Sequence, residues 1–106
     1  MEADAVMRNI KCCTITDAVA ELCIKANTVL PSDIRALIDS ASTLEAVPLG
    51  RDILRDLREN YNLAEKEGIP ICQDTGMAVV FAELGQDLHI TDGNFEEAIN
   101  EGVRQG

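Results

Sequence analysis

The stretch Gly68-Ile69-Pro70-Ile71-Cys72-Gln73-Asp74-Thr75-Gly76 decides how the rest of the chain is interpreted. Pro70 fixes its own φ and restricts the residue before it to extended conformations. Gly76 accepts backbone angles, or a close approach of another group, that a side chain would prevent. We therefore expect Cys72, Gln73 and Asp74 to lie on a short extended piece that ends in a bend.

These polar residues have useful chemistry. A thiolate is a soft metal ligand, a carboxylate moves a proton or binds a cation, and an amide orients a substrate carboxylate. The pattern thus favours a functional site at Cys72. A second interpretation stays open at this point: a buried structural cysteine followed by a turn, because free cysteine often behaves as a small hydrophobe.

Amphipathic helices are predicted before this stretch, in three pieces over residues 14–67. Thr14 and Asp17 have the spacing of a capping box at the start of the first helix. Ser32, after a proline, is expected to cap the second. Residues 1–13 are expected to be a loose leader. The apolar stripes of the first two helices have helical spacing and consist of Ile15, Val19, Leu22, Cys23, Ala26, Ile34, Leu37, Ile38 and Ala41.

Pro48 opens the third predicted helix, and Gly68 follows its last residue as a favoured C-terminal cap. Its apolar stripe consists of Ile53, Leu54, Leu57, Tyr61 and Ala64. The charged residues between these positions predict a solvated face with pairs such as Arg55 and Glu59, four residues apart.

The residues after the motif predict a β-hairpin. Residues 77–82 form a continuous apolar run, typical of a strand buried on both faces. Gly85-Gln86-Asp87 predicts a turn, and Leu88-His89-Ile90 alternates as a short strand that pairs back. Asn94, with Glu97 three residues on, predicts the start of a last helix. The expected fold is α+β: helices over 14–67, the motif and hairpin over 68–91, and a helix over 92–106.

Net charge limits the class of partner. The chain has 9 basic and 19 acidic residues and a net charge of −10, which argues against nucleic acid or an anionic membrane surface. The acidic N-terminus is unlike a secretory signal, and no apolar stretch is long enough to cross a bilayer. We therefore expect a cytoplasmic protein whose four cysteines are thiols or ligands. The absence of a Cys-x-x-Cys pair argues against a closed zinc site.

The heptapeptide over residues 70–76, with the apolar run after it, closely resembles the iron–sulfur hydro-lyase family. That family holds class I fumarases and the alpha subunit of L(+)-tartrate dehydratase. The resemblance extends over about residues 7–106, and the heptapeptide is its specific part. The other similar segments, in order, are Ile15–Val19, Leu22–Ile24, Leu30-Pro31, Gly85–Asp87 and Glu97–Val103.

The resemblance implies a [4Fe-4S] cluster held by three cysteines, with Cys72 as one metal ligand. It implies that Gln73 and Asp74 bind substrate and that Asp74 is the catalytic residue in proton transfer. The implied reaction is the reversible addition or removal of water on a small dicarboxylate, with fumarate and malate favoured and tartrate as the alternative. A Lewis acid at the hydroxyl and a positioned base are what this reaction needs.

The chain also departs from the family pattern. Cys12, Cys13 and Cys23 match no ligand position, so the resemblance implies that the other cluster ligands and the cationic substrate groups lie beyond Gly106. We therefore expect the N-terminal part of a larger domain, inactive alone. Its expected partners are the remainder of an alpha subunit and a beta subunit or C-terminal domain, in an oligomer. The alternative function is a non-enzymatic acidic helical interaction module in which Cys72 is buried or redox-responsive.

Overall fold

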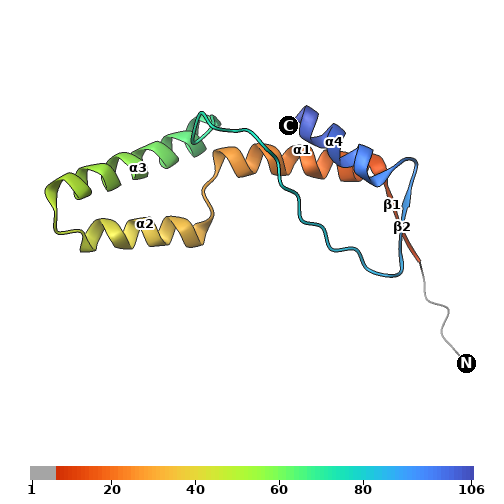
Figure 1. The fold of residues 1–106 in the computed structure, drawn as a ribbon, viewed down its shortest axis with the longest axis horizontal. Coiled ribbons are helices and arrows are strands. Elements are labelled where there is room, and N and C mark those ends of the chain that lie inside the picture. Colours follow the sequence, from red (N-terminus) through yellow and green to blue (C-terminus); the bar gives the residue numbers. More distant parts are fainter. Residues whose placement is uncertain (1–6) are drawn as a thin grey trace, which may run out of the picture. The chain divides into compact units, whose positions relative to one another are not determined.

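A computed structural model describes residues 7–106, which form two compact units. The first unit holds residues 7–24 and 77–106, and the second holds Lys25–Gly76. The elements labelled in Figure 1 are, in chain order, β1 (Arg8–Lys11), α1 (Cys12–Thr28), α2 (Ser32–Leu44), α3 (Pro48–Glu67), β2 (Leu88–Thr91) and α4 (Phe95–Gln105). The three helices expected over residues 14–67, and the last helix, are confirmed.

Helix ends follow local signals in some places and not in others. Pro48 begins α3, and Asn94 caps α4 by accepting the backbone N–H of Glu97 at 3.1 Å, both as expected. The cap predicted at Thr14 is wrong, because α1 begins at Cys12 and Thr14 lies inside it. Ser32 is the first residue of α2 rather than its cap, and Pro31 precedes it without a side-chain capping bond.

The first unit contains a two-stranded parallel sheet. β1 pairs with β2 in the register that places Arg8 opposite Leu88 and Lys11 opposite Thr91. The leader expected over residues 1–13 is therefore wrong from Arg8 onward, because residues 8–11 form β1 and α1 follows. Residues 1–6 of that predicted leader lie outside the described residues.

Close helix packing completes the first unit. Thr16 in α1 is buried, and its Oγ1 donates to the carbonyl oxygen of Ala98 in α4 at 2.8 Å. A Cβ added at Gly102 would lie 2.6 Å from the Cβ of Val19 and 2.7 Å from the Thr16 carbonyl oxygen. Glycine at this position is what lets α1 and α4 approach so closely.

The second unit contains an antiparallel pair of helices, α2 and α3, joined by a short connection (Figure 1). Tyr61 and Ala64 of the expected α3 stripe are buried, at 3% and 1% exposure. Ile53 and Leu57 of the same stripe are 52% and 46% exposed. The expected apolar face of α3 is thus covered only toward its C-terminal end.

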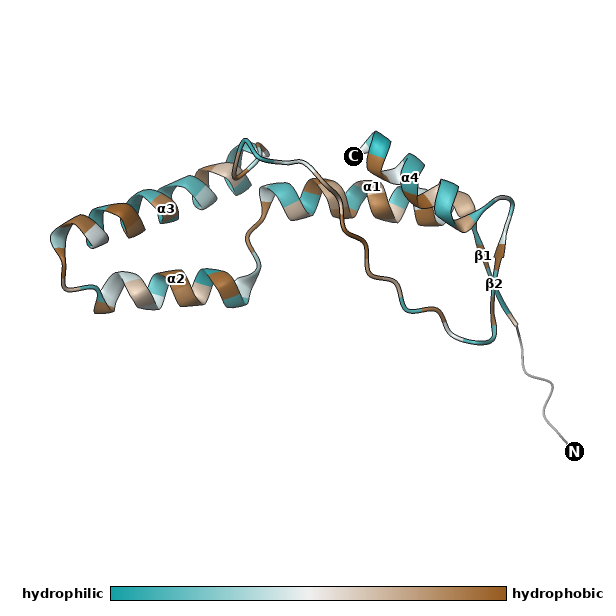
Figure 2. Ribbon diagram, in the orientation of Figure 1, coloured by the Kyte–Doolittle hydropathy of each residue, from teal (hydrophilic) through white to brown (hydrophobic). Residues whose placement is uncertain are grey.

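The hairpin predicted after the motif is not formed. Residues 74–85 adopt neither helix nor strand, and Met77 and Phe81 are 89% and 93% exposed rather than buried. Figure 2 shows this apolar run as the brown irregular segment that leads to β2. Tight hairpin turns need a positive φ at their central residues, and none of the turn residues Gly85–Asp87 has one.

The strand predicted over 77–82 does not form, and the reason is non-local. A strand must satisfy its backbone groups through a neighbour, and the strand expected to pair with this run, β2, pairs with β1 instead.

Among residues 7–106, no helix has the length and the apolar composition needed to cross a bilayer.

Candidate functional site

The motif begins where α3 ends. Gly68 has φ 64° and ψ 37°, the left-handed conformation that commonly terminates a helix, and its N–H bonds to the Ala64 carbonyl oxygen. The N–H of Ile69 also donates to that oxygen, at 3.1 Å. The glycine predicted as a cap is therefore confirmed. It directs the chain away from the helix axis immediately before Pro70.

Ile71, the residue before Cys72, is held on both sides. Its N–H donates to the carbonyl oxygen of Asn27 at 2.8 Å, and its carbonyl oxygen accepts from Asn60 Nδ2 at 2.8 Å. Asn27 lies in the last turn of α1, and Asn60 lies in α3. The backbone that leads into the motif is thus tied, within the second unit, to the last turn of α1 and to α3.

Cys72, Gln73 and Asp74 lie together on the surface of the second unit, and all three are exposed. The backbone N–H of Asp74 donates to Cys72 Sγ at 3.4 Å. The motif folds back on itself through this bond, so its bend occurs at residues 71–73. The interpretation of Cys72 as a buried structural cysteine is wrong, because its side chain is open to solvent.

The residue with unusual backbone geometry is Met77 rather than Gly76. Met77 has φ 53°, a left-handed value that is uncommon for a bulky side chain. Gly76 has no such angle, and a Cβ added there would meet nothing within 4 Å. The freedom expected at Gly76 is therefore not used in this structure.

The other cysteines belong to the first unit. Cys12 is buried, Cys23 is partly buried and Cys13 is exposed. Within the part of the chain that the structure describes, no three His, Cys, Asp or Glu side chains gather as a metal ion would require. Cys72 offers a thiol, which is the ligand type that iron–sulfur clusters normally use. Its thiol is accessible and accepts a backbone N–H, and hydrogen bonds to cluster sulfurs are among the factors that set the potential.

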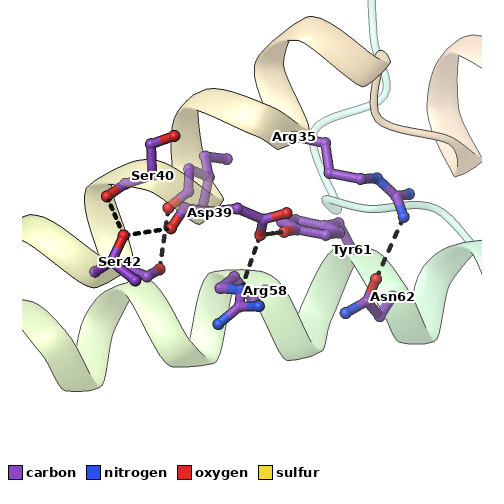
Figure 3. Close-up of polar contacts among 9 residues, drawn as sticks. Arg35, Asp39, Ser40, Ser42, Arg58, Tyr61 and Asn62 are labelled. Carbon is purple, nitrogen blue, oxygen red and sulfur yellow. Dashed lines mark hydrogen bonds and ion pairs between the residues drawn. The ribbon is translucent and has the colours of Figure 1, made fainter.

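A polar cluster between α2 and α3, drawn in Figure 3, was not predicted from the sequence. Asp39 accepts from the Tyr61 hydroxyl at 2.6 Å and from Arg58 Nε at 2.9 Å. The Arg35 guanidinium carbon lies 4.9 Å from the centre of the Tyr61 ring, a cation–π contact. Arg35 also pairs with Glu65. These contacts join α2 to α3, the helix whose C-terminal end leads into the motif.

The pKa values in this cluster follow from its hydrogen bonds. The Tyr61 hydroxyl, and then Arg58, hold the pKa of Asp39 below its ordinary value. The hydrogen bond to Asp39 raises the pKa of Tyr61. Both groups thus keep their usual charge at neutral pH, and the cluster acts as a helix clamp rather than an acid–base pair.

The predicted charged face of α3 needs two corrections. Arg55 pairs with Asp52 at 3.1 Å and lies 3.9 Å from Asp56, whereas Glu59 was its expected partner. Arg58 reaches across to α2 instead of lying only in solvent. A face with many charges gives several pairing choices of similar energy, and sequence spacing does not select among them.

Comparison with known proteins matches the sequence of this chain to one family. A family model described as "Fumarate hydratase (Fumerase)" matches residues 16–106. The chain belongs to this family. Membership places it among the hydro-lyases of the fumarase and tartrate dehydratase type and implies an iron–sulfur cluster.

One curated relative is the "Putative L(+)-tartrate dehydratase subunit alpha" of Methanocaldococcus jannaschii. It is 33% identical over 92 residues, which are 86% of this chain and 32% of the relative. The chain therefore spans about a third of the length of that relative. No solved structure matches the chain significantly.

Two contributors to the site were missed by sequence reasoning. Asn27 and Asn60 hold the Ile71 backbone, yet neither lies near the motif in sequence. Asn60 did carry a weak signal, because asparagine is a poor helix former and here occupies an interior position of a 20-residue helix. Asn27 acts through its backbone, which leaves no mark in the sequence.

Proposed function

We propose that this chain is part of a [4Fe-4S]-dependent hydro-lyase that reversibly adds or removes water on a small dicarboxylate. The observation that carries the proposal is the heptapeptide of residues 70–76, with an accessible Cys72 thiol and Asp74 beside it, in a chain of this family. Fumarate and malate are the favoured substrates. Tartrate is the alternative, supported by the name of the relative.

Cys72 would hold one iron of the cluster, which supplies a Lewis acid for the substrate hydroxyl when it is bound. Gln73 donates hydrogen bonds through its side-chain amide, as substrate-carboxylate binding requires. Asp74 supplies an exposed carboxylate two residues from the ligand, within the same bend, where it contacts substrate and transfers a proton. The remaining ligands and the cationic groups come from further polypeptide.

The ion pairs of the second unit support the proposal that the cationic substrate-binding groups come from further polypeptide. Arg35 and Arg58 are paired with Glu65 and Asp39 in the helix clamp, and Arg55 is paired within α3. Positive charge for the substrate carboxylates must therefore come from groups other than these. We place the partners as the remainder of an alpha subunit and a beta subunit or C-terminal domain. The thiol state of all four cysteines suits a cytoplasmic enzyme.

The test is to combine the chain with its completing polypeptide, load iron and sulfide anaerobically, and assay fumarate hydration and L(+)-tartrate dehydration in parallel. We expect the wild-type enzyme to turn over one of the two substrates. We expect Asp74→Asn to lose this turnover and to keep its iron. Full turnover by Asp74→Asn would remove the proton-transfer role. Cluster-loaded protein without activity on either substrate would overturn the proposed reaction.

The interaction-module alternative keeps one supporting observation, the exposed apolar run that contains Met77 and Phe81. Only its redox-responsive form remains, since Cys72 is not buried. A chain that binds a protein partner and never acquires iron in its presence would favour this alternative over the hydro-lyase.

A further inference from the structure

Asn60 has a contact that its place in α3 does not by itself require. The residue is exposed and lies in the helix interior, where asparagine stabilises a helix less than alanine does. Its side-chain amide donates to the carbonyl oxygen of Ile71, eleven residues further along the chain, at 2.8 Å. The side chain therefore links the helix to the backbone immediately before Cys72.

Two hydrogen bonds restrict the backbone rotation of Ile71. The N–H is fixed by Asn27 of α1 and the carbonyl oxygen by Asn60 of α3, both at 2.8 Å. Rotation of this residue would break one bond or the other. The Ile71 carbonyl oxygen belongs to the peptide bond whose nitrogen is that of Cys72, so the amide of Asn60 fixes the plane from which the Cys72 side chain departs.

We propose that Asn60 is a positioning residue for Cys72 and for the bend of residues 71–74. The inference rests on the proposed function, in which Cys72 is a cluster ligand. In this role Asn60 does not itself bind cluster or substrate. It acts through Ile71 and sets where Cys72 Sγ lies before iron binds. A ligand held in place loses less conformational freedom on binding, so the cluster is retained longer.

The chain offers a matched control on the same helix. Asn62 is also an exposed asparagine of α3, but its Oδ1 accepts from Arg35 at 3.5 Å, away from the motif. Replacing either residue with alanine removes an amide and raises helix propensity equally. A role in helix stability alone therefore predicts the same outcome for both variants.

The first measurement is amide hydrogen exchange of Ile71 and Asp74, by NMR, in the chain without iron. Asn60→Ala should speed exchange at both amides by a factor of roughly 3 to 10, the shift expected from one lost hydrogen bond. Asn62→Ala should leave both rates unchanged, and Asn60→Gln, which keeps the donor, should restore part of the protection. Unchanged exchange in Asn60→Ala would overturn the proposal.

The second measurement uses the completed, cluster-loaded enzyme. Asn60→Ala should lose iron to a chelator roughly 3 to 10 times faster and should alter the EPR spectrum of the reduced cluster, while Asn62→Ala does neither. Faster exchange without faster iron loss would overturn the cluster role of Asn60. A wild-type enzyme that never binds iron would instead overturn the proposed function, and the exchange result would still decide whether Asn60 positions Cys72.

Discussion

Substitutions at three residues should distinguish a role in metal binding from a role in proton transfer and from a role in packing. Cys72→Ser replaces a soft thiolate with a harder and more basic alcohol, so the completed enzyme should lose its cluster and its turnover. Cys23→Ser places a hydroxyl at a partly buried position and should cost about 1 kcal/mol of stability, with cluster content per folded molecule unchanged. Asp74→Asn should keep iron and lose turnover.

The measurement is iron and sulfide per folded molecule beside turnover for the three variants. Cys23→Ser is the control, because the structure places this cysteine in the first unit and, among residues 7–106, in no group of side chains that could hold a metal ion. A Cys72→Ser enzyme with a full cluster, together with a Cys23→Ser enzyme that has none, would reverse the assignment.

At the scale of elements, Glu101 links the stability of α4 to pH. Arg104 and then Gln105, through hydrogen bonds, lower the pKa of Glu101 from 4.5 to about 2. A carboxylate with a lowered pKa stabilises the fold above its ordinary pKa, and this contribution is lost as the pH falls toward 2. The stability difference between wild type and Glu101→Gln should be full well above pH 4.5 and should shrink as the pH falls toward 2.

Urea unfolding followed by circular dichroism at several pH values between 2 and 7 gives this difference directly. The other carboxyl groups titrate in both proteins and cancel in the comparison. A difference that stayed constant from pH 7 to pH 2 would contradict the role assigned to Arg104.

Two glycines within helices should respond oppositely to alanine. At Gly102 the new Cβ would meet the Thr16 carbonyl oxygen at 2.7 Å, a backbone atom that cannot move alone, so we expect a loss of roughly 1–3 kcal/mol. At Gly50 the nearest atoms, at 2.8 Å, belong to the flexible side chain of Glu45, so the gain in helix propensity should stabilise α3 by up to about 1 kcal/mol. Thermal unfolding of both variants checks this, and a stabilised Gly102→Ala would mean that α1 and α4 pack less closely.

Local signals explain which elements could be predicted. Pro48, Gly68 and Asn94 act within one turn of their own helix, and the sequence places all three correctly. A strand was expected over Leu88–Ile90, where β2 lies, but its partner, β1, is far away in sequence and was not expected. The run over 77–82 has strand-like composition, yet composition does not say whether a neighbour is available to pair with it.

The candidate site divides in the same way. Cys72, Gln73 and Asp74 are adjacent in sequence, so their grouping could be predicted, but they were expected on an extended piece before a bend, and the bend lies at residues 71–73 instead. The contacts that hold the bend join Ile71 to residues far from it along the chain, at Asn27 and Asn60. Which side chain supports a loop depends on how the helices pack, and no spacing rule gives that.

At the scale of the whole molecule, we expect the 106-residue chain alone to be inactive. One accessible cysteine on the motif supplies one ligand, and the chain spans about a third of its curated relative. After anaerobic incubation with iron and sulfide, the isolated chain should hold no stoichiometric cluster and hydrate no fumarate. The same chain mixed with its completing polypeptide is the positive control, and a stoichiometric active cluster in the chain alone would contradict the proposed division of ligands.

The exposed segment Met77-Ala78-Val79-Val80-Phe81-Ala82 has a consequence for how the chain is made and stored. It lacks proline and glycine, is uncharged, and carries β-branched and aromatic residues, which is the composition of segments that stack into amyloid. Asp74 before it and Glu83 after it are the flanking charges that oppose such stacking. High salt screens this repulsion, so the concentrated chain alone should form fibres sooner at high ionic strength than at low ionic strength.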